Sequence, residues 1–304
     1  MQKKVILITG PTAVGKTAAA IHIARHFQTE IISADSRQCF KELSIGVARP
    51  SVEELQQVPH HFVTSHHIDE PVSAAIFEKY AIGISNQIFR SKDVLVMAGG
   101  TGLYAKAFME GLDDIPAIDA DIRSRLLYEF ELNGIDWLQA QLRQRDPLYS
   151  SQGSMHNPQR MLRALEVITG TGQSILSFQQ KKIKLRDFDV VSISLELPRE
   201  ELYTRINARV DQMMATGLWE EVQKLYPYRN LNALQTVGYK ELFDYVDGKH
   251  TMQVAVELIK RNTRQFAKRQ CTWFAHQLEA QLFHPEAFQS MLTYIESELT
   301  SDRT

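Results

Sequence analysis

The sequence is short of cysteine, of apolar runs and of secretion signals. Its two cysteines, Cys39 and Cys271, form no C-x-x-C pair, so neither a disulfide framework nor a zinc knuckle is indicated. No uninterrupted apolar run reaches membrane-spanning length, and the strand-like VILIT at Val5–Thr9 follows the N-terminus too closely to leave room for a signal peptide. We therefore expect a cytoplasmic protein in a reducing compartment.

An excess of positive charge is also missing. The formal net charge is −2, and the 304 residues are 44% hydrophobic and 23% charged, which is ordinary for a globular protein. Bulk electrostatic coating of nucleic acid is thereby excluded, so any RNA binding must come from local basic patches. We expect a monomer.

Apolar runs alternate with helical patterns in the first hundred residues. Strands are predicted at Val5–Thr9, Glu30–Ser33 and Val94–Ala98, with helices at Thr17–Phe27 and Ala74–Arg90. The runs are rich in β-branched residues and do not alternate with polar ones, as a parallel sheet covered on both faces requires. The fold class predicted is therefore α/β.

The pattern becomes purely helical in the middle of the chain. Helices are predicted at Asp121–Asn133, Asp136–Gln144 and Pro158–Thr169, and strand character returns at Val190–Leu195. This order predicts a core formed by residues 1–112 and 185–304, with an inserted helical domain at residues 113–184. After Leu197 the chain is helical almost throughout, which predicts a helical C-terminal region.

A phosphate-binding loop lies between the first strand and the first helix. The motif G-x-x-x-x-G-K-[ST] is matched by Gly10, Pro11, Thr12, Ala13, Val14, Gly15, Lys16 and Thr17. Backbone N–H groups from Ala13 to Thr17 are expected to converge on phosphate oxygens at the positive end of the helix dipole. Lys16 would add a mobile positive charge and Thr17 a ligand for Mg²⁺. The fold predicted is thus a P-loop NTPase-like sheet.

The P-loop does not identify the phosphate compound. The strand Val94–Ala98 ends in Gly99–Tyr104 without an acid, whereas Glu30–Ser33 leads to Asp35. Both turns should lie at the carboxyl ends of parallel strands, beside the P-loop. Asp35 is then a Mg²⁺ ligand, a base for an incoming nucleophile, or a cap of the next turn.

Several longer segments together resemble the bacterial tRNA dimethylallyltransferases, also called isopentenyl-diphosphate:tRNA isopentenyltransferases. The resemblance is collinear and nearly full length. It is carried by GPTAVGKT at Gly10–Thr17, ISADSRQ at Ile32–Gln38, IGVARP at Ile45–Pro50, AGGTGLY at Ala98–Tyr104, NPQRMLRALEV at Asn157–Val167, TVGYKEL at Thr236–Leu242 and TRQFAKRQCTWF at Thr263–Phe274. Family members of eukaryotic type can carry a C-terminal zinc finger, which this chain lacks, so the bacterial form is indicated.

The resemblance implies an activity. Such enzymes use dimethylallyl diphosphate and Mg²⁺ to attach a dimethylallyl group to N6 of the adenosine just 3′ of the anticodon, position 37 of tRNA. It implies that Asp35 is the general base and that Thr101 lies near the diphosphate and the target base. Lys16 and Thr17 would stabilise the departing diphosphate.

The same resemblance implies contacts with tRNA. Around the target base these are Asp35, Ser36, Arg37, Gln38 and Thr101; in the insertion they are Arg123, Gln159, Arg160, Met161, Leu162 and Arg163; in the C-terminal region they are Arg264, Lys268 and Arg269. Family members often have an arginine in the segment before VGY, where this chain has Leu234-Gln235-Thr236. Either Gln235 or a basic residue elsewhere, such as Arg264, is then a candidate contact for the phosphates.

Two other functions share the P-loop. A small-molecule or nucleotide kinase would leave GGTGLY and the basic helices unexplained, and an adenylate prenyltransferase acting on free AMP or ATP would not need Arg160 and Arg163. The histidine pairs His60-His61 and His66-His67 have no ligand spacing that we can defend. We interpret them as structural, in loop and edge positions.

Overall fold

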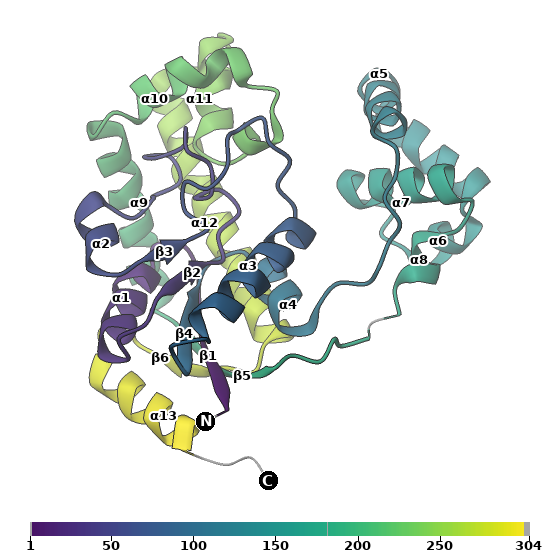
Figure 1. Cartoon of the computed structure of the whole chain (residues 1–304). Coiled ribbons are helices and arrows are strands. Elements are labelled where there is room, and N and C mark those ends of the chain that lie inside the picture. The colour runs from purple at the N-terminus through teal and green to yellow at the C-terminus, as the bar shows by residue number, and fades with distance from the viewer. Residues whose placement is uncertain (1, 181, 301–304) are drawn as a thin grey trace. The chain divides into compact units, whose positions relative to one another are not determined.

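The computed structural model describes residues 2–180 and 182–300 (Figure 1). The chain divides into two compact units. The first, here called the core unit, comprises Met1–Met109 and Leu185–Thr304, and the second, the insertion, comprises Glu110–Lys184. No helix in the described ranges combines the length and apolarity that a membrane crossing requires.

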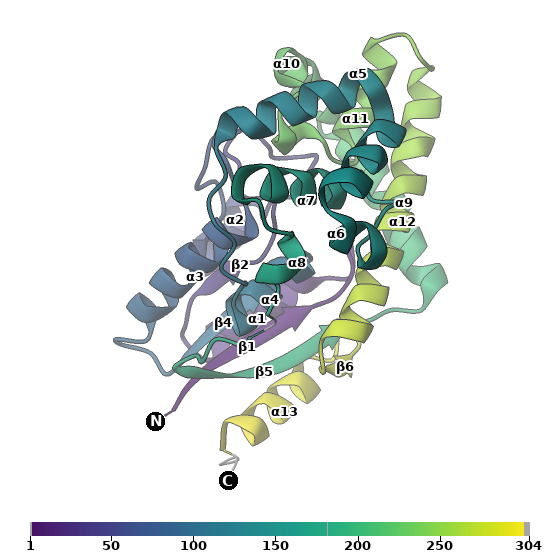
Figure 2. The ribbon, with the colours of Figure 1, turned by 90° about the vertical axis from the view of Figure 1, so that its right-hand side faces the viewer.

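The core unit contains a six-stranded parallel sheet, which confirms the predicted fold class. The strand order is β3-β2-β4-β1-β5-β6, and Figure 2 shows β1 beside β5. The strands are β1 (Lys3–Thr9), β2 (Ile31–Ser33), β3 (His60–His61), β4 (Val94–Ala98), β5 (Phe188–Leu195) and β6 (Gln281–Phe283). Because β4 lies between β1 and β2, the loops after these three strands meet at one edge of the sheet.

Helices cover both faces of this sheet. The helices of the core unit are α1 (Lys16–His26), α2 (Val52–Gln57), α3 (Ala74–Ile88), α4 (Gly102–Glu110), α9 (Arg199–Ala215), α10 (Leu218–Leu225), α11 (Tyr239–Val246), α12 (Met252–Gln277) and α13 (Phe288–Thr300). Val5 and Leu7 of β1 pack with α3 and α4 on one face, and Ile6 and Ile8 pack with α1 and α13 on the other. The strand alternation therefore fills two apolar layers, one on each face of the sheet.

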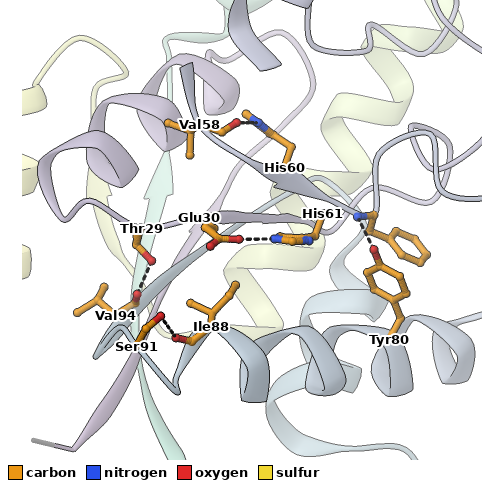
Figure 3. Close-up of polar contacts among 10 residues, drawn as sticks. Thr29, Glu30, Val58, His60, His61, Tyr80, Ile88, Ser91 and Val94 are labelled. Atoms are coloured by element: carbon orange, nitrogen blue, oxygen red, sulfur yellow. Dashed lines mark hydrogen bonds and ion pairs between the residues drawn. The ribbon is translucent and has the colours of Figure 1, made fainter. Parts of the chain in front are cut away.

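The edge strand β3 carries two of the histidines. His61 Nε2 lies 2.6 Å from Glu30 Oε2, and His60 Nδ1 lies 2.8 Å from the carbonyl oxygen of Val58 (Figure 3). The backbone N–H of Phe62 donates to the Tyr80 hydroxyl at 3.4 Å, which ties the end of β3 to α3 (Figure 3). The edge position predicted for this pair is confirmed by the strand order.

The insertion is helical, with its own apolar core. Its helices are α5 (Ala120–Arg145), α6 (Pro147–Gln152), α7 (Pro158–Thr171) and α8 (Ile175–Phe178). The core is formed by Leu126, Leu138, Leu142, Leu165 and their neighbours. The sequence predicted two helices within α5, and the break between them is confirmed: Gly134 has a non-helical backbone (φ 72°, ψ −166°), and two helices meet there at a kink. A glycine adopts this backbone conformation without steric cost, so it can separate the two helices.

One carboxylate holds the loop between β2 and α2. Glu221 of α10 accepts hydrogen bonds from the backbone N–H groups of Ser44, Ile45 and Gly46 at 3.1, 2.9 and 3.0 Å. The Tyr239 hydroxyl donates to the same carboxylate at 2.6 Å. Hydrogen bonds to a charged acceptor are stronger than neutral ones. This loop is therefore fixed to the C-terminal helices through one side chain.

We expect Glu221→Gln to lower the free energy of unfolding by about 2–3 kcal/mol, because the amide turns a donor toward backbone N–H groups and leaves them unpaired. Urea unfolding measures the loss. The exposed neighbour provides a matched control, since Glu220→Gln changes the same charge and should stay within about 0.5 kcal/mol of the parent chain. Equal effects of the two variants would refute the proposed importance of the Glu221 carboxylate.

Candidate active site

The P-loop begins α1 without any side-chain cap. Gly15, the residue before α1, is left-handed (φ 106°), makes no side-chain cap bond, and is followed by a first turn without acidic residues. Gly10 is also at positive φ, and a Cβ there would lie 2.6 Å from the carbonyl oxygen of Leu195. Uncapped N–H groups at a helix N-terminus favour anions. This local geometry suits a phosphate.

Lys16 is folded back over its own loop. Its Nζ donates to the carbonyl oxygens of Gly10 at 2.9 Å and Pro11 at 2.7 Å. Burial lowers the pKa of Lys16 to about 8, while the Asp35 carboxylate opposes and the Arg209 guanidinium reinforces this shift. The ammonium is thus poorly solvated, so an arriving phosphate would offer it a compensating charge.

Asp35 caps the turn that follows β2. Its Oδ1 accepts from the backbone N–H groups of Arg37 at 2.8 Å and Gln38 at 3.2 Å. Within the described ranges, no hydrogen bond engages its other oxygen, Oδ2. The cap that the sequence left as one alternative is therefore present, and it leaves one carboxylate oxygen for a further role.

Thr101 is held against the Asp35 turn. Its hydroxyl accepts from the Ser36 N–H at 3.1 Å, and its own N–H donates to the Ala34 carbonyl at 3.1 Å. Gly99 permits this approach, because a Cβ there would lie 2.1 Å from the Ala34 oxygen. The glycine run after β4 therefore brings Thr101 beside Asp35.

The side chains that follow Asp35 are already engaged within the core unit. Arg37 NH1 donates to the Asn232 carbonyl at 3.0 Å, and burial lowers the pKa of Arg37. The Gln38 amide accepts from Ser33 Oγ at 3.3 Å and donates to the Ala48 carbonyl at 3.0 Å. Both residues shape the loop around Asp35.

A cavity of about 50 Å³ connects the P-loop to Asp35. It is lined by Lys16, Thr17, Ala20, Ile31, Ser33, Asp35, Gln38, Pro50, His60, Ala98 and Gly99. A larger cleft of about 250 Å³ lies at the amino end of the sheet, lined by Lys3, Phe188 and Arg186 among others. The smaller cavity is the better candidate, since ligands of open α/β sheets bind at the carboxyl ends of the strands.

The donors at this cavity fit Mg²⁺. Thr17, Ser33 and Asp35 present hard oxygen ligands, and no three His, Cys, Asp or Glu side chains converge anywhere in residues 2–180 and 182–300. Mg²⁺ typically takes one or two protein oxygens and completes its shell with water and substrate phosphates. The residues present match that mode and not a protein cage.

Arg209 of α9 is a functional candidate that sequence reasoning missed. Its charge acts on Lys16, and burial lowers the pKa of Arg209 itself, opposed by Glu54. In the described part of the chain it makes no hydrogen bond or ion pair. The candidates named from sequence are otherwise occupied: Gln235 donates to the Arg229 carbonyl at 2.6 Å, and Arg264 donates to Asn207 Oδ1 at 2.6 Å. Arg209 is thus the guanidinium available near the P-loop.

Gln270 of α12 was missed as well. Its Oε1 accepts from the Thr12 N–H at 2.8 Å, and its Nε2 donates to the Gly100 carbonyl at 2.8 Å. Three residues further on, Trp273 packs so closely on Gly102 that a Cβ there would lie 2.2 Å from its ring. One buried amide therefore joins the P-loop to the loop after β4.

The residues of the insertion that were expected to bind tRNA separate into two groups. Gln159 and Arg160 are exposed at the start of α7, where Asn157 caps the helix. Met161 and Leu162 are buried in the insertion, 0% and 7% exposed. The expectation that these two side chains contact tRNA is corrected, because they face the apolar core.

The basic residues of α12 are partly used by the fold. Lys260 pairs with Asp211 at 2.8 Å and Glu257 at 3.2 Å, and Arg264 is held by Asn207. Lys268 and Arg269 are exposed. Lys268 and Arg269 therefore provide exposed positive charge in the C-terminal half of this helix.

Fold and site together define a P-loop protein that can cradle a phosphate compound beside a carboxylate. A family model described as IPP transferase matches residues 38–277. The tRNA dimethylallyltransferase of Christiangramia forsetii is 48% identical over 302 residues, 99% of this chain and 100% of the relative. That of Cytophaga hutchinsonii is 44% identical over 299 residues, 98% of each chain.

Solved structures agree with these relatives. The full-length tRNA isopentenylpyrophosphate transferase of Bacillus halodurans superimposes with a TM-score of 0.72 at 35% identity, covering 98% of this chain and 97% of that one. A eukaryotic dimethylallyltransferase studied while acting on tRNA gives a TM-score of 0.78 at 26% identity, covering 98% and 77%. The chain belongs to the IPP transferase family and is a prenyltransferase.

Binding of dimethylallyl diphosphate should weaken as the pH rises through about 8, because Lys16 then loses its positive charge. The dissociation constant should rise by up to about tenfold per pH unit above that point. Titration calorimetry from pH 6.5 to 9.5 measures it. Lys16→Met removes the titrating group and leaves only the ligand's own ionisation. The affinity of this variant should therefore be lower, and it should change little between pH 6.5 and 9.5. Identical pH profiles of the two proteins would contradict the assignment.

Gln270→Met should raise the dissociation constant for dimethylallyl diphosphate about tenfold, because it removes two hydrogen bonds of about 1 kcal/mol each that fix the phosphate loops. Calorimetry measures the diphosphate affinity, and filter binding should show tRNA affinity within about twofold. Gln265→Met, at an exposed position of the same helix, is the control and should leave both unchanged. Unaltered diphosphate binding in Gln270→Met would show that the bridge is dispensable.

Proposed function

We propose that the chain transfers a dimethylallyl group from dimethylallyl diphosphate to N6 of the adenosine directly 3′ of the anticodon in tRNA. The observation that carries the proposal is the shared cavity of Lys16, Thr17 and Asp35 in a chain whose relatives are tRNA dimethylallyltransferases. The cavity supports the proposal because alkylation of a weak amine nucleophile requires a leaving-group site next to a proton acceptor.

The leaving group is stabilised on the P-loop side. As the allylic C–O bond breaks, negative charge builds on the diphosphate, and the uncapped N–H groups of α1 with the Lys16 ammonium oppose it. Arg209 adds a second cation from α9. The allylic fragment carries a delocalised positive charge, so an electron-poor carbon is presented to the incoming amine.

The proton is removed on the Asp35 side. N6 of adenine is a weak base because its lone pair is delocalised into the ring, and its proton becomes acidic only as the new C–N bond forms. Oδ2 of Asp35 then accepts that proton, while Oδ1 remains bound to the backbone of the turn. Thr101, bonded to the same turn, would orient the target base.

Mg²⁺ is the cation that this donor set fits. Thr17, with Asp35 or Ser33 nearby, would hold it together with substrate oxygens. When bound, it would supply positive charge to the departing diphosphate.

The tRNA would be held by both units separately. In the core unit the contacts are Ser36 and Thr101 near the target base and Lys268 and Arg269 on α12. In the insertion they are Gln159, Arg160, Arg163 and Arg123. Extruding the adenine costs a few kcal/mol, and phosphate contacts of this kind offset that cost. We propose a cytoplasmic, monomeric enzyme.

Transfer of radiolabel decides among the acceptors. Dimethylallyl diphosphate with Mg²⁺ is incubated with an unmodified tRNA bearing adenosine 3′ of the anticodon, and in parallel with AMP and ATP. We expect label in tRNA alone. Label in free nucleotide would instead assign an adenylate prenyltransferase, and phosphate released from ATP without any label transfer would assign a kinase.

Asp35→Asn should lower kcat for prenyl transfer by about 10²–10⁴-fold, because the amide keeps the cap acceptor but cannot take the N6 proton. Single-turnover transfer at saturating dimethylallyl diphosphate measures the rate, so a change in diphosphate affinity caused by the loss of the Asp35 charge beside Lys16 does not affect the result. Asp69→Asn, at an exposed loop position, makes the same chemical change and should be silent. Full turnover by Asp35→Asn would remove Asp35 from the base role.

A further inference from the structure

The insertion contains a buried carboxylate that the proposed chemistry does not use. Glu166 lies on α7 among Leu165, Val167 and the other core residues, and it is 3% exposed. A carboxylate in an apolar layer is costly unless it is paired. The buried Glu166 carboxylate therefore needs positively charged or hydrogen-bonding partners.

Each oxygen of Glu166 faces a different arginine. Oε2 accepts from Arg163 NH1 at 3.1 Å, one turn earlier on the same helix. Oε1 lies 3.6 Å from the Nε of Arg123, which belongs to the first turn of α5. The carboxylate thus links two helices through two guanidinium groups.

The arginines are only partly enclosed by this arrangement. The Arg123 side chain is 57% exposed and that of Arg163 is 40% exposed. A guanidinium has five N–H donors, and each of these contacts engages one group of it. In the described ranges the remaining donors have no hydrogen-bond partner, so they are available at the surface.

Stability alone does not explain the cluster. Apolar residues of similar volume usually replace a buried ion pair without loss, and often with a gain. By contrast, a phosphate is recognised best by a planar guanidinium that is already oriented, since ordering a free arginine on binding costs affinity. The geometry therefore suits recognition better than folding.

We propose that Glu166 is a positioning residue that fixes Arg123 and Arg163 in the orientation in which they bind RNA phosphates. This inference rests on the proposed binding of tRNA by the insertion. The carboxylate itself does not touch RNA; it restricts the rotamers of two cations, which together exceed its own charge. Arg160, exposed on the same helix, lies outside the cluster and contributes charge without this control.

Glu166→Gln and Glu166→Leu test the proposal because orientation and net charge predict opposite signs. Both variants remove a negative charge beside RNA-binding arginines, so charge alone predicts tighter tRNA binding. Loss of orientation of the two arginines predicts instead that the dissociation constant for tRNA rises approximately tenfold. Filter binding of an unmodified tRNA transcript at constant ionic strength measures it, with KM for tRNA rising and kcat unchanged.

Controls separate this role from a structural one. Glu131→Gln removes the same charge at an exposed position of α5 and should leave affinity unchanged. Glu166→Leu should melt no lower than the parent chain, so its weaker binding cannot be attributed to unfolding. In a chain that already carries Arg123→Ala and Arg163→Ala, Glu166→Gln should cause no additional loss. An additional loss there, or equal or tighter binding by the single variants, overturns the proposal.

Arg160→Ala distinguishes the positioning role of Glu166 from the binding of tRNA by the insertion. If it weakens tRNA binding while the Glu166 variants do not, the insertion binds tRNA and only the positioning role is wrong. If neither Arg160→Ala nor the Glu166 variants change the affinity, both the positioning role and tRNA binding by this surface are wrong. Weaker binding by all three supports both.

Discussion

The active site depends on the pairing of three parallel strands in the order β2, β4, β1. Because β4 lies in the middle, the loop after it can bond to both neighbours: Ala34 N–H donates to the Ala98 carbonyl at 2.8 Å, and Gly99 N–H donates to the Ile8 carbonyl at 3.2 Å. The absence of a side chain at Gly99 permits the close approach of the Ala34 backbone, whose oxygen would lie 2.1 Å from a Cβ there. The phosphate loop, the carboxylate and Thr101 are thereby set in one framework of backbone bonds, and the Gln270 amide reinforces it by joining the P-loop to the loop after β4.

Much of this framework could be predicted from the sequence, since it is encoded locally. The P-loop spacing with its strand and helix flanks, the apolar runs, and the Asp35 turn each occupy one short segment. Residues contributed by distant helices were not predictable in the same way. Arg209 and Gln270 come from α9 and α12, and on a helix face nothing in the sequence distinguishes a residue that points at the P-loop from one that points at water. The packing of those helices decides it.

The errors have the same origin. Met161 and Leu162 were included because they lie inside a segment that resembles the tRNA dimethylallyltransferases. A helix places adjacent residues about 100° apart, so a contiguous segment cannot face RNA throughout. Likewise Arg264 and Lys268 share a helix face by spacing, but Asn207 of α9 already binds Arg264. Spacing predicts which residues share a face and does not predict which neighbour covers it.

The cations of the two units differ in how far neighbouring carboxylates compensate their charge, and the difference agrees with the ligands proposed for each unit. Near the P-loop, Asp35 acts on Lys16 and Glu54 acts on Arg209, yet burial lowers the pKa of both cations. The proposed binding of a diphosphate there would relieve a desolvation cost that folding has already incurred. In the insertion, Glu166 compensates Arg123 and Arg163 in advance. Recognition of a flexible polyanion depends more on oriented hydrogen-bond donors than on a high local density of positive charge. Binding of a small, highly charged ligand depends more on the charge density. Basic side chains would therefore provide strong attraction for the ligand in the core unit and oriented contacts with RNA phosphates in the insertion.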